Sequence, residues 1–273
     1  MIDTSDFEDL RFELDDGVAL ITLDRPEQLN AFSGAMGRSL GNAYTRCDED
    51  DEVRVIVLTG AGRAFCAGAD MAPAGDTFAA PSGESFSASA VEPPAFELRK
   101  PVIAAVNGHA VGLGFTLTLQ CDIRILAEEG KYGVLQVQRG VMPDAYAHWT
   151  LPRIVGMSRA AEVLLTGAKF SAARAYELGL ASRVLPAAEV LPAALALARE
   201  IATQTAPVSV AVTKRLMWES FSLSPEATER KETALHHVVM GSPDSAEGVM
   251  AFIEKRKPEW KGSVRRDFPE WPD

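Results

Sequence analysis

Apolar residues in the first half of the chain are grouped in short runs that suit buried β-strands. The runs are residues 17–23 (GVALITL), 53–59 (VRVIVLT), 101–106 (PVIAAV) and 122–126 (DIRIL). Ser33 suits the N-cap of a helix that runs to about Cys47. Strands that alternate with helical patterns in this way favour an α/β fold with a mainly parallel sheet.

From residue 158 onward the pattern changes to helices. Two short helices are predicted to end at Gly167 and Gly179, and longer ones are predicted over 187–204, 208–221, 225–240 and 243–257. Ser242 suits the N-cap of the last one, with Pro243 at its first position. We therefore expect an α/β core over residues 1–200 and a helical C-terminal section over residues 201–273.

The segment 72–97 (APAGDTFAAPSGESFSASAVEPPAFE) is rich in Ala, Ser, Gly and Pro and shows no periodicity. A stretch of this length without a regular pattern is uncommon inside a compact domain and is often a functional loop. Because it lies between two predicted strands, we expect it to form a lid or the wall of a pocket.

Composition narrows the class of protein. The 273 residues are 47% hydrophobic and 24% charged, which is typical of a globular chain. The formal net charge of −11 disfavours a nucleic-acid partner. The acidic start and the absence of an apolar run of about 18 residues predict neither a signal peptide nor a membrane helix. Cys47, Cys66 and Cys121 suit free thiols rather than disulfides or a metal site, so we expect a cytoplasmic protein.

Two segments, 55–71 and 101–122, share the order strand, glycine-rich turn, helix start. Backbone N–H groups at a helix start lack partners inside the helix, so each turn can hold an anion or a developing oxyanion. Two such turns that face each other can donate to the same carbonyl oxygen. Tight packing is the plainer explanation of either turn taken alone. Neither turn has the spacing of a P-loop or of a dinucleotide-binding fingerprint.

The order and spacing of five segments resemble the crotonase superfamily, that is, the enoyl-CoA hydratase/isomerase family. The segments are DRPEQLNAFS, DEVRVIVLTGAGRAFCAGADM, KPVIAAVNGHAVGLGFTLTLQCDIRI, LPRIVGMSRAAEVLLTG and SAEGVMAFIEKRKPEWKG. The resemblance covers roughly residues 8–262. It implies a spiral of ββα repeats and a helical C-terminal part that builds homotrimers, usually paired into hexamers. It also implies an acyl-CoA thioester as substrate, with coenzyme A as part of that substrate and no permanently bound cofactor.

The resemblance places the thioester oxygen between the backbone N–H groups of Ala69 and Leu113. Losing one such donor typically costs about 3–4 kcal/mol of transition-state stabilisation. It also implies contacts with the substrate or its coenzyme A at a larger set of positions: Arg25, Leu29, Ala67, Asp70, Met71, Gly112, Thr116, Gln136, Phe252 and Lys255. The last two would reach the coenzyme A of a neighbouring subunit. The alternative for the cations near residue 255 is a solvated helix end.

This sequence differs from the family's hydratases at two positions. Hydratases carry a glutamate at each of these positions, and the two glutamates position and activate a water molecule. Thr116 and Gln136 stand at those two places in this sequence. Neither side chain can act as a general base near neutral pH. Hydration by a pair of glutamates is therefore not expected of this chain.

Asp144, just after Pro143, is the remaining candidate. In the family's isomerases and aryl-CoA dehalogenases, an aspartate at the matching place lies beside the acyl chain. The isomerase-like use, a lone carboxylate that moves a proton while the enolate is held, is the one we expect. Attack by Asp144 as a nucleophile, in a hydrolase or dehalogenase, is an alternative, as is a purely structural Pro-Asp turn. A hydratase that works through other groups and a degenerate acyl-CoA-binding protein also remain open.

Overall fold

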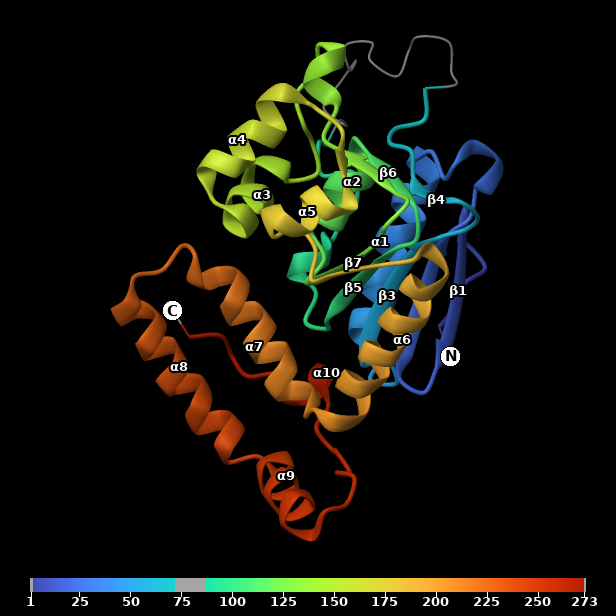
Figure 1. Cartoon of the computed structure of the whole chain (residues 1–273). Helices are drawn as coiled ribbons and strands as arrows, with labels where there is room; N and C mark the ends of the chain where they lie inside the picture. The colour runs from blue at the N-terminus through green and yellow to red at the C-terminus, as the bar shows by residue number, and fades with distance from the viewer. Residues whose placement is uncertain (1, 72–86, 273) are drawn as a thin grey trace.

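The computed structural model describes residues 2–71 and 87–272. Its larger sheet has six strands in the order β1-β2-β3-β5-β7-β10. Their bounds are β1 Leu10–Asp15, β2 Val18–Leu23, β3 Val55–Gly60, β5 Val102–Val106, β7 Ile123–Ala127 and β10 Arg183–Leu185. All neighbours are parallel except β1 and β2. The predicted α/β class with a mainly parallel sheet is thus confirmed (Figure 1).

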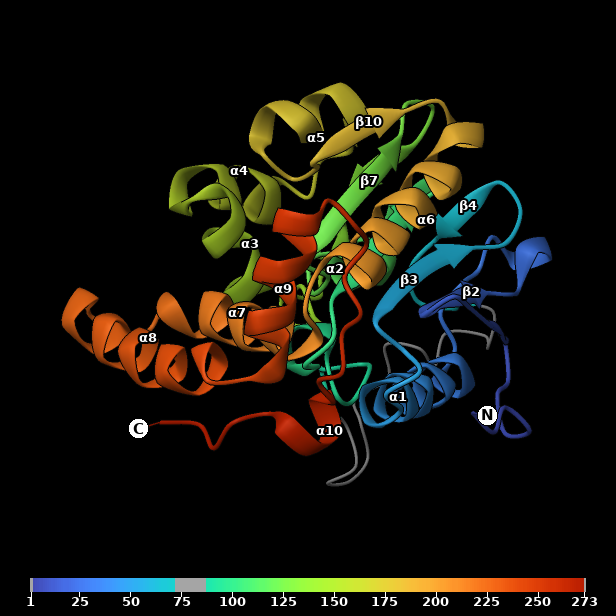
Figure 2. The ribbon, with the colours of Figure 1, turned by 90° about the horizontal axis from the view of Figure 1, so that it is seen from below.

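Residues of β3 alternate between the two faces of this sheet, as a strand requires. Val55 and Val57 pack with the alanines of α6 (Ala187–Gln204), which runs along one face. Ile56 and Leu58 belong to the main core on the other face, where α1 (Gly34–Glu49) lies. Figure 2 shows the sheet between these two helices.

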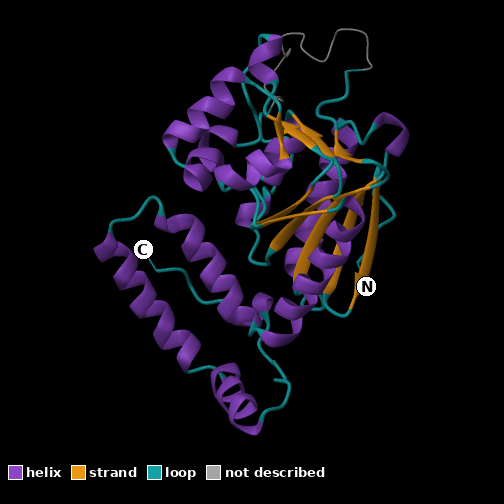
Figure 3. Cartoon of the chain, in the orientation of Figure 1, coloured by secondary structure: helices purple, strands orange, loops and turns teal. Residues whose placement is uncertain are grey.

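A second, four-stranded sheet has the order β4-β6-β8-β9, with bounds β4 Ala64–Cys66, β6 His109–Val111, β8 Lys131–Gly133 and β9 Phe170–Ser171. Strands β4 and β6 are parallel, and Cys66 pairs with Ala110. Because one glycine-rich turn follows each of these strands, their pairing brings the two turns side by side. Figure 3 shows both sheets gathered in one part of the molecule.

The remaining helices follow in chain order. They are α2 Leu113–Thr118, α3 Ala147–Val155, α4 Met157–Thr166, α5 Ala172–Leu178, α7 Pro207–Ser220, α8 Pro225–Met240, α9 Pro243–Glu254 and α10 Val264–Asp267, with short 3-10 turns η1 Pro26–Gln28, η3 Ala95–Glu97 and η4 Gln136–Arg139. Ser33 and Ser242 cap α1 and α9 as predicted. Helix α9 ends before residue 257 because Lys255 takes a left-handed conformation at its C-cap.

Helices α7 to α10 extend from the core as a C-terminal section (Figure 1). Helix α6 continues to Gln204 and packs on the sheet as far as Ala202. A boundary between core and C-terminal section at residue 200 would therefore cut through α6. The position of that boundary stays a prediction.

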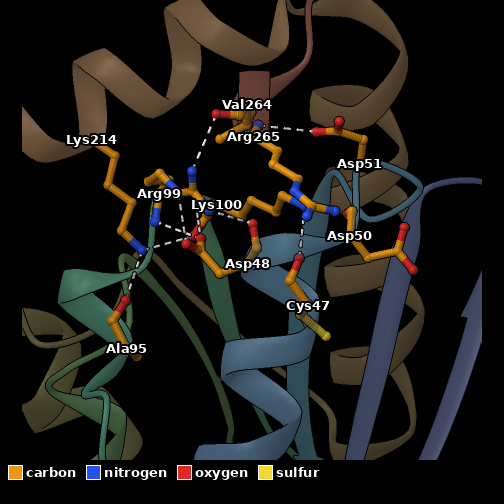
Figure 4. A network of polar contacts seen from close by, with 10 residues as sticks. All are labelled: Cys47, Asp48, Asp50, Asp51, Ala95, Arg99, Lys100, Lys214, Val264 and Arg265. Carbon is orange, nitrogen blue, oxygen red and sulfur yellow. Dashed lines mark hydrogen bonds and ion pairs between the residues drawn. The ribbon is translucent and has the colours of Figure 1, made fainter. Parts of the chain in front are cut away.

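A polar network fastens this section to the core (Figure 4). The Asp48 carboxylate, near the end of α1, accepts hydrogen bonds from the Arg99 backbone N–H at 2.7 Å and from its Nε at 2.7 Å. Arg99 also donates to the Val264 carbonyl at 3.3 Å, at the start of α10. Lys214 of α7 is buried and donates to the Ala95 carbonyl at 2.8 Å. The first and the last helix of the C-terminal section, α7 and α10, are thus tied to the same region of the core.

The cysteines, the apolar segments and the acidic and histidine side chains were also assessed from the sequence. Cys47, Cys66 and Cys121 are buried free thiols, and burial raises the pKa of each to about 12. Within the described residues, no helix is long and apolar enough to cross a membrane. Residues 2–71 and 87–272 hold no group of three His, Cys, Asp or Glu side chains that suits a metal ion. Residues 72–86 of the expected lid or pocket wall lie outside the described part of the chain.

Candidate active site

The two glycine-rich turns are in close contact. A Cβ atom at Gly114, in the first turn of α2, would lie 2.3 Å from the Cys66 carbonyl oxygen. Only glycine allows α2 to approach β4 so closely. Gly68 has φ +94° and Gly112 φ +55°, conformations that side-chain-bearing residues rarely adopt. These glycines let the two turns meet at one cavity.

The backbone N–H of Ala69 is directed away from its neighbouring strand segment. Phe32 donates to the Gly68 carbonyl at 2.8 Å, and the Asp70 N–H donates to the Phe32 carbonyl at 3.0 Å. This parallel bridge leaves the Ala69 N–H on the opposite side. No described residue accepts a hydrogen bond from it.

The backbone N–H of Leu113 is in a comparable position. Leu113 is the first residue of α2, so its N–H has no partner inside the helix. The preceding Gly112 N–H is occupied by the Gly133 carbonyl at 2.8 Å. Within the described residues, no acceptor is bonded to the Leu113 N–H. The site therefore offers two unoccupied donors from two adjoining turns.

A cavity of about 90 Å³ lies beside these turns. Its walls include seven of the residues singled out from the sequence: Ala67, Ala69, Met71, Gly112, Leu113, Gln136 and Asp144. The cavity is also lined by residues that the sequence analysis did not single out, among them Val111, Leu135, Arg139 and Val141. Larger open spaces lie elsewhere, and the one between α7 and α8 measures about 390 Å³.

Asp144 is held by one oxygen. Its Oδ1 accepts a hydrogen bond from Gln136 Nε2 at 3.0 Å and one from Thr116 Oγ1 at 3.2 Å, whose single hydroxyl proton is shared with the Leu113 carbonyl at 3.1 Å. No described side chain donates to Oδ2. Burial raises the pKa of the Asp144 carboxyl, although the hydrogen bonds from Thr116 and Gln136 oppose that rise. The carboxylate does not cap α3, whose N-cap is Tyr146 with no side-chain bond.

Arg25, Leu29 and Asp70 shape the loop beneath the first turn. Arg25 Nη1 donates to Asp70 Oδ2 at 2.8 Å and to the Ala31 carbonyl at 2.7 Å. The Leu29 carbonyl accepts from the Ala67 N–H at 3.0 Å. These contacts fix the backbone that carries Ala69. A contact of the three residues with coenzyme A stays a prediction.

Phe252 and Lys255 do not lie at this cavity in the single chain. Both are exposed near the end of α9, and the Phe252 side chain is 85% accessible. Neighbouring Arg256 is engaged by Glu247 at 2.5 Å. A contact of Phe252 and Lys255 with the coenzyme A of a neighbouring subunit stays a prediction.

Comparison with known proteins identifies the family. The sequence model of the enoyl-CoA hydratase/isomerase family matches residues 13–263. Enoyl-CoA hydratase ACTT3 of Alternaria alternata is 36% identical over 257 residues, which is 93% of this chain and 86% of that protein. Probable enoyl-CoA hydratase echA8 of Mycobacterium tuberculosis is 36% identical over 255 residues, 93% of this chain and 98% of that one.

Solved structures agree with this match. A probable enoyl-CoA hydratase/isomerase from Mycobacterium abscessus is 58% identical with a TM-score of 0.90, covering 93% of this chain and 99% of that one. Enoyl-CoA hydratase from Bacillus anthracis is 34% identical with a TM-score of 0.85, covering 94% and 100%. The fold and the paired turns therefore define a protein of the crotonase superfamily. The chain belongs to the enoyl-CoA hydratase/isomerase family, whose members act on coenzyme A thioesters.

Proposed function

We propose that this acyl-CoA enzyme stabilises a thioester enolate and shifts a proton or a double bond with Asp144 alone. The observation that carries this proposal is the pair of hydrogen bonds to Asp144 Oδ1 from Thr116 and Gln136. By resemblance, these two residues occupy the places of the hydratase glutamates. In this chain both residues donate to the Asp144 carboxylate. Asp144 is the only acidic residue in the cavity wall among the described residues.

The N–H groups of Ala69 and Leu113 would hold the thioester oxygen. When a proton leaves the carbon α or γ to the thioester, its bonding electrons move into the acyl system and charge gathers on that oxygen. Preorganised donors lower the energy of this enolate, and each is worth about 3–4 kcal/mol in comparable sites. Since both donors are backbone groups, the turn geometry matters more than the side chain of Leu113.

Asp144 would take the proton on Oδ2 and return it to another carbon. One group can perform both steps because the enolate stays bound between them. The raised pKa of the Asp144 carboxyl makes it a stronger base than an exposed aspartate. The bonds to Oδ1 keep the other oxygen directed to the ligand.

The coenzyme A part of the substrate would contact the loop of Arg25, Leu29, Asp70 and Met71. Phe252 and Lys255 of a neighbouring copy would complete that contact in a homotrimer or homohexamer. The exposure of both residues in the single chain supports this arrangement. We further propose that the protein works in the cytoplasm.

Hydration is the second candidate, because the curated relatives quoted above are named hydratases. In this chain, Asp144 would have to activate the water, since Thr116 and Gln136 cannot take a proton near neutral pH. A nucleophilic Asp144, or binding of acyl-CoA without reaction, are the remaining alternatives.

The products formed from 3-hexenoyl-CoA and 2-hexenoyl-CoA test the proposal. Wild type should convert the 3-enoyl into the conjugated 2-enoyl thioester without a change of mass. Asp144→Asn should slow this at least about 100-fold, whereas the exposed control Glu13→Gln should not. Mass spectrometry and ultraviolet absorbance report the products.

Several outcomes would contradict the proposed proton transfer by Asp144. Gain of one water would indicate a hydratase, release of free coenzyme A a hydrolase, and tight binding without any product a binding protein. Unchanged turnover in Asp144→Asn would exclude Asp144 as the base.

A further inference from the structure

Gln120 is a buried amide close to the site that the reaction proposed above does not use. It lies two residues after the end of α2, and it is 1% exposed. Its Nε2 donates to the Ala145 carbonyl at 3.1 Å, and its Oε1 accepts from the Ala95 N–H at 3.4 Å. The amide thus bridges the segment before β5 and the residue that follows Asp144.

The backbone after Asp144 takes an unfavourable conformation. Ala145 has φ +49° and Tyr146 φ +62°, so two consecutive residues with side chains are left-handed. This region costs roughly 1–2 kcal/mol per residue for L-amino acids other than glycine. Such a turn persists only where its surroundings hold it. Two hydrogen bonds hold Ala145: its carbonyl accepts from Gln120, and its N–H donates to the Ala88 carbonyl at 2.8 Å.

The other end of the bridge is itself fixed. The Ala95 carbonyl accepts from Lys214 Nζ at 2.8 Å, as Figure 4 shows. Lys214 is buried and also pairs with Asp122 Oδ2 at 2.9 Å. The Ala95 backbone that Gln120 contacts is therefore fixed by Lys214, a residue of α7 in the C-terminal section.

We propose that Gln120 is a positioning residue that holds the left-handed turn and thereby sets where Asp144 stands. This inference rests on the proposed role of Asp144 as the base. Thr116 and Gln120 are four residues apart on one segment: the first holds the carboxylate, and the second holds the peptide carbonyl of the next residue. Together they determine both the orientation and the place of the carboxylate.

The test replaces Gln120 with methionine, which has similar length and no hydrogen-bonding amide. For 3-hexenoyl-CoA, kcat should fall about 10-fold to 100-fold, the range expected of a small displacement of a reacting group. KM should stay within about twofold because the thioester contacts are unchanged. Gln204→Met, at an exposed glutamine at the end of α6 and outside the cavity wall, is the matched control and should leave both constants unchanged.

Rescue separates positioning from general destabilisation. Glycine adopts φ +49° without strain, so Ala145→Gly added to Gln120→Met should restore kcat to within about threefold of wild type. A merely structural role of Gln120 would not be repaired at this position. If Gln120→Met does not fold, Gln120→Asn, one methylene shorter, cannot span Ala95 and Ala145 and should give the same result.

A crystal structure of the variant decides the question even where 3-hexenoyl-CoA is not turned over. We expect Ala145 to leave the left-handed region and Asp144 to lose a bond to Oδ1. An unchanged turn, or an unchanged kcat in a variant whose turn has moved, would overturn the inference. Loss of activity in Asp144→Asn with normal kcat in Gln120→Met would refute the role of Gln120 while leaving the proposed function intact.

Discussion

Opposing effects act on the Asp144 carboxyl. Burial disfavours its charged form and raises its pKa, whereas donation by Thr116 and Gln136 favours the charge. Gln136 directs its nitrogen to Asp144, and its buried Oε1 has no partner within the described residues. An unsatisfied buried acceptor costs about 1–3 kcal/mol. The orientation of this amide therefore serves the carboxylate at the expense of stability.

We predict that Asp144→Asn raises stability while it abolishes activity. The amide oxygen can still accept from Thr116 and Gln136, and the buried charge is gone. Because the folded-state pKa of Asp144 is raised, the folded protein binds more protons than the unfolded chain just above the usual aspartate pKa of 3.8. The contribution of Asp144 to stability then falls as pH rises through that window.

The gain in Tm of Asp144→Asn over wild type should accordingly be larger at neutral pH than near pH 4. Thermal unfolding of both proteins at the two pH values measures it, with Glu13→Gln as a control that should show little difference. A lower Tm for Asp144→Asn at neutral pH would show that the charge is stabilised in the folded state.

Individual residues were predictable to different degrees. The sequence motifs pointed to Asp144, Thr116 and Gln136, but not to the bonds among them, since Thr116 and Asp144 are 28 residues apart in the chain. Gln120 was missed. Its only signal was a lone amide in the apolar run that precedes Asp122, and such a residue gives no indication of its partners.

At the level of elements, the site depends on how closely α2 approaches β4. The two unoccupied N–H groups can converge only if the turns after β4 and β6 touch. Gly114 makes this possible, because a Cβ there would also lie 2.7 Å from the Cys66 Cβ. Cys66 belongs to the buried core and has little room to move.

We predict that Gly114→Ala lowers the free energy of unfolding by about 1–3 kcal/mol through overpacking. It should also weaken the binding of acyl-CoA, since α2 must move away from β4. Urea unfolding and calorimetric titration with butyryl-CoA measure the two effects. Gly34→Ala is the control: its nearest contact would be 3.5 Å away, to the Arg38 side chain, so no loss is expected. A Gly114→Ala protein as stable as wild type would refute the close approach.

The sequence predicted long elements better than short ones. Helices α6 and α8 have the expected bounds, since each carries several turns of periodic pattern. Strands β4, β6 and β8 have three residues each, too few for an alternation to be recognised. Helix α3 was missed: it has nine residues, half the length of α6, and no capping side chain marks its start.

For the whole molecule, the α/β fold followed from the order of strands and helices, and the family from motifs spread along the chain. The assembly did not. The last helices expose several large apolar side chains: Met217, Phe221, Val238, Met240, Val249, Met250, Phe252 and Ile253. Apolar surface of this kind is typical of a protein–protein contact. The homotrimer or homohexamer stays a prediction, because neither a sequence nor one chain shows what covers that surface.

The most direct test of the account follows deuterium from solvent into the substrate. Wild type and Asp144→Asn are incubated with 3-hexenoyl-CoA and 2-hexenoyl-CoA in D₂O, and NMR locates the label. We expect wild type to move the double bond and to place deuterium at the carbon α or γ to the thioester, with both processes lost in Asp144→Asn. Exchange at the wild-type rate in Asp144→Asn, or formation of a 3-hydroxyacyl product without double-bond migration, would contradict the assignment of Asp144 as the single base.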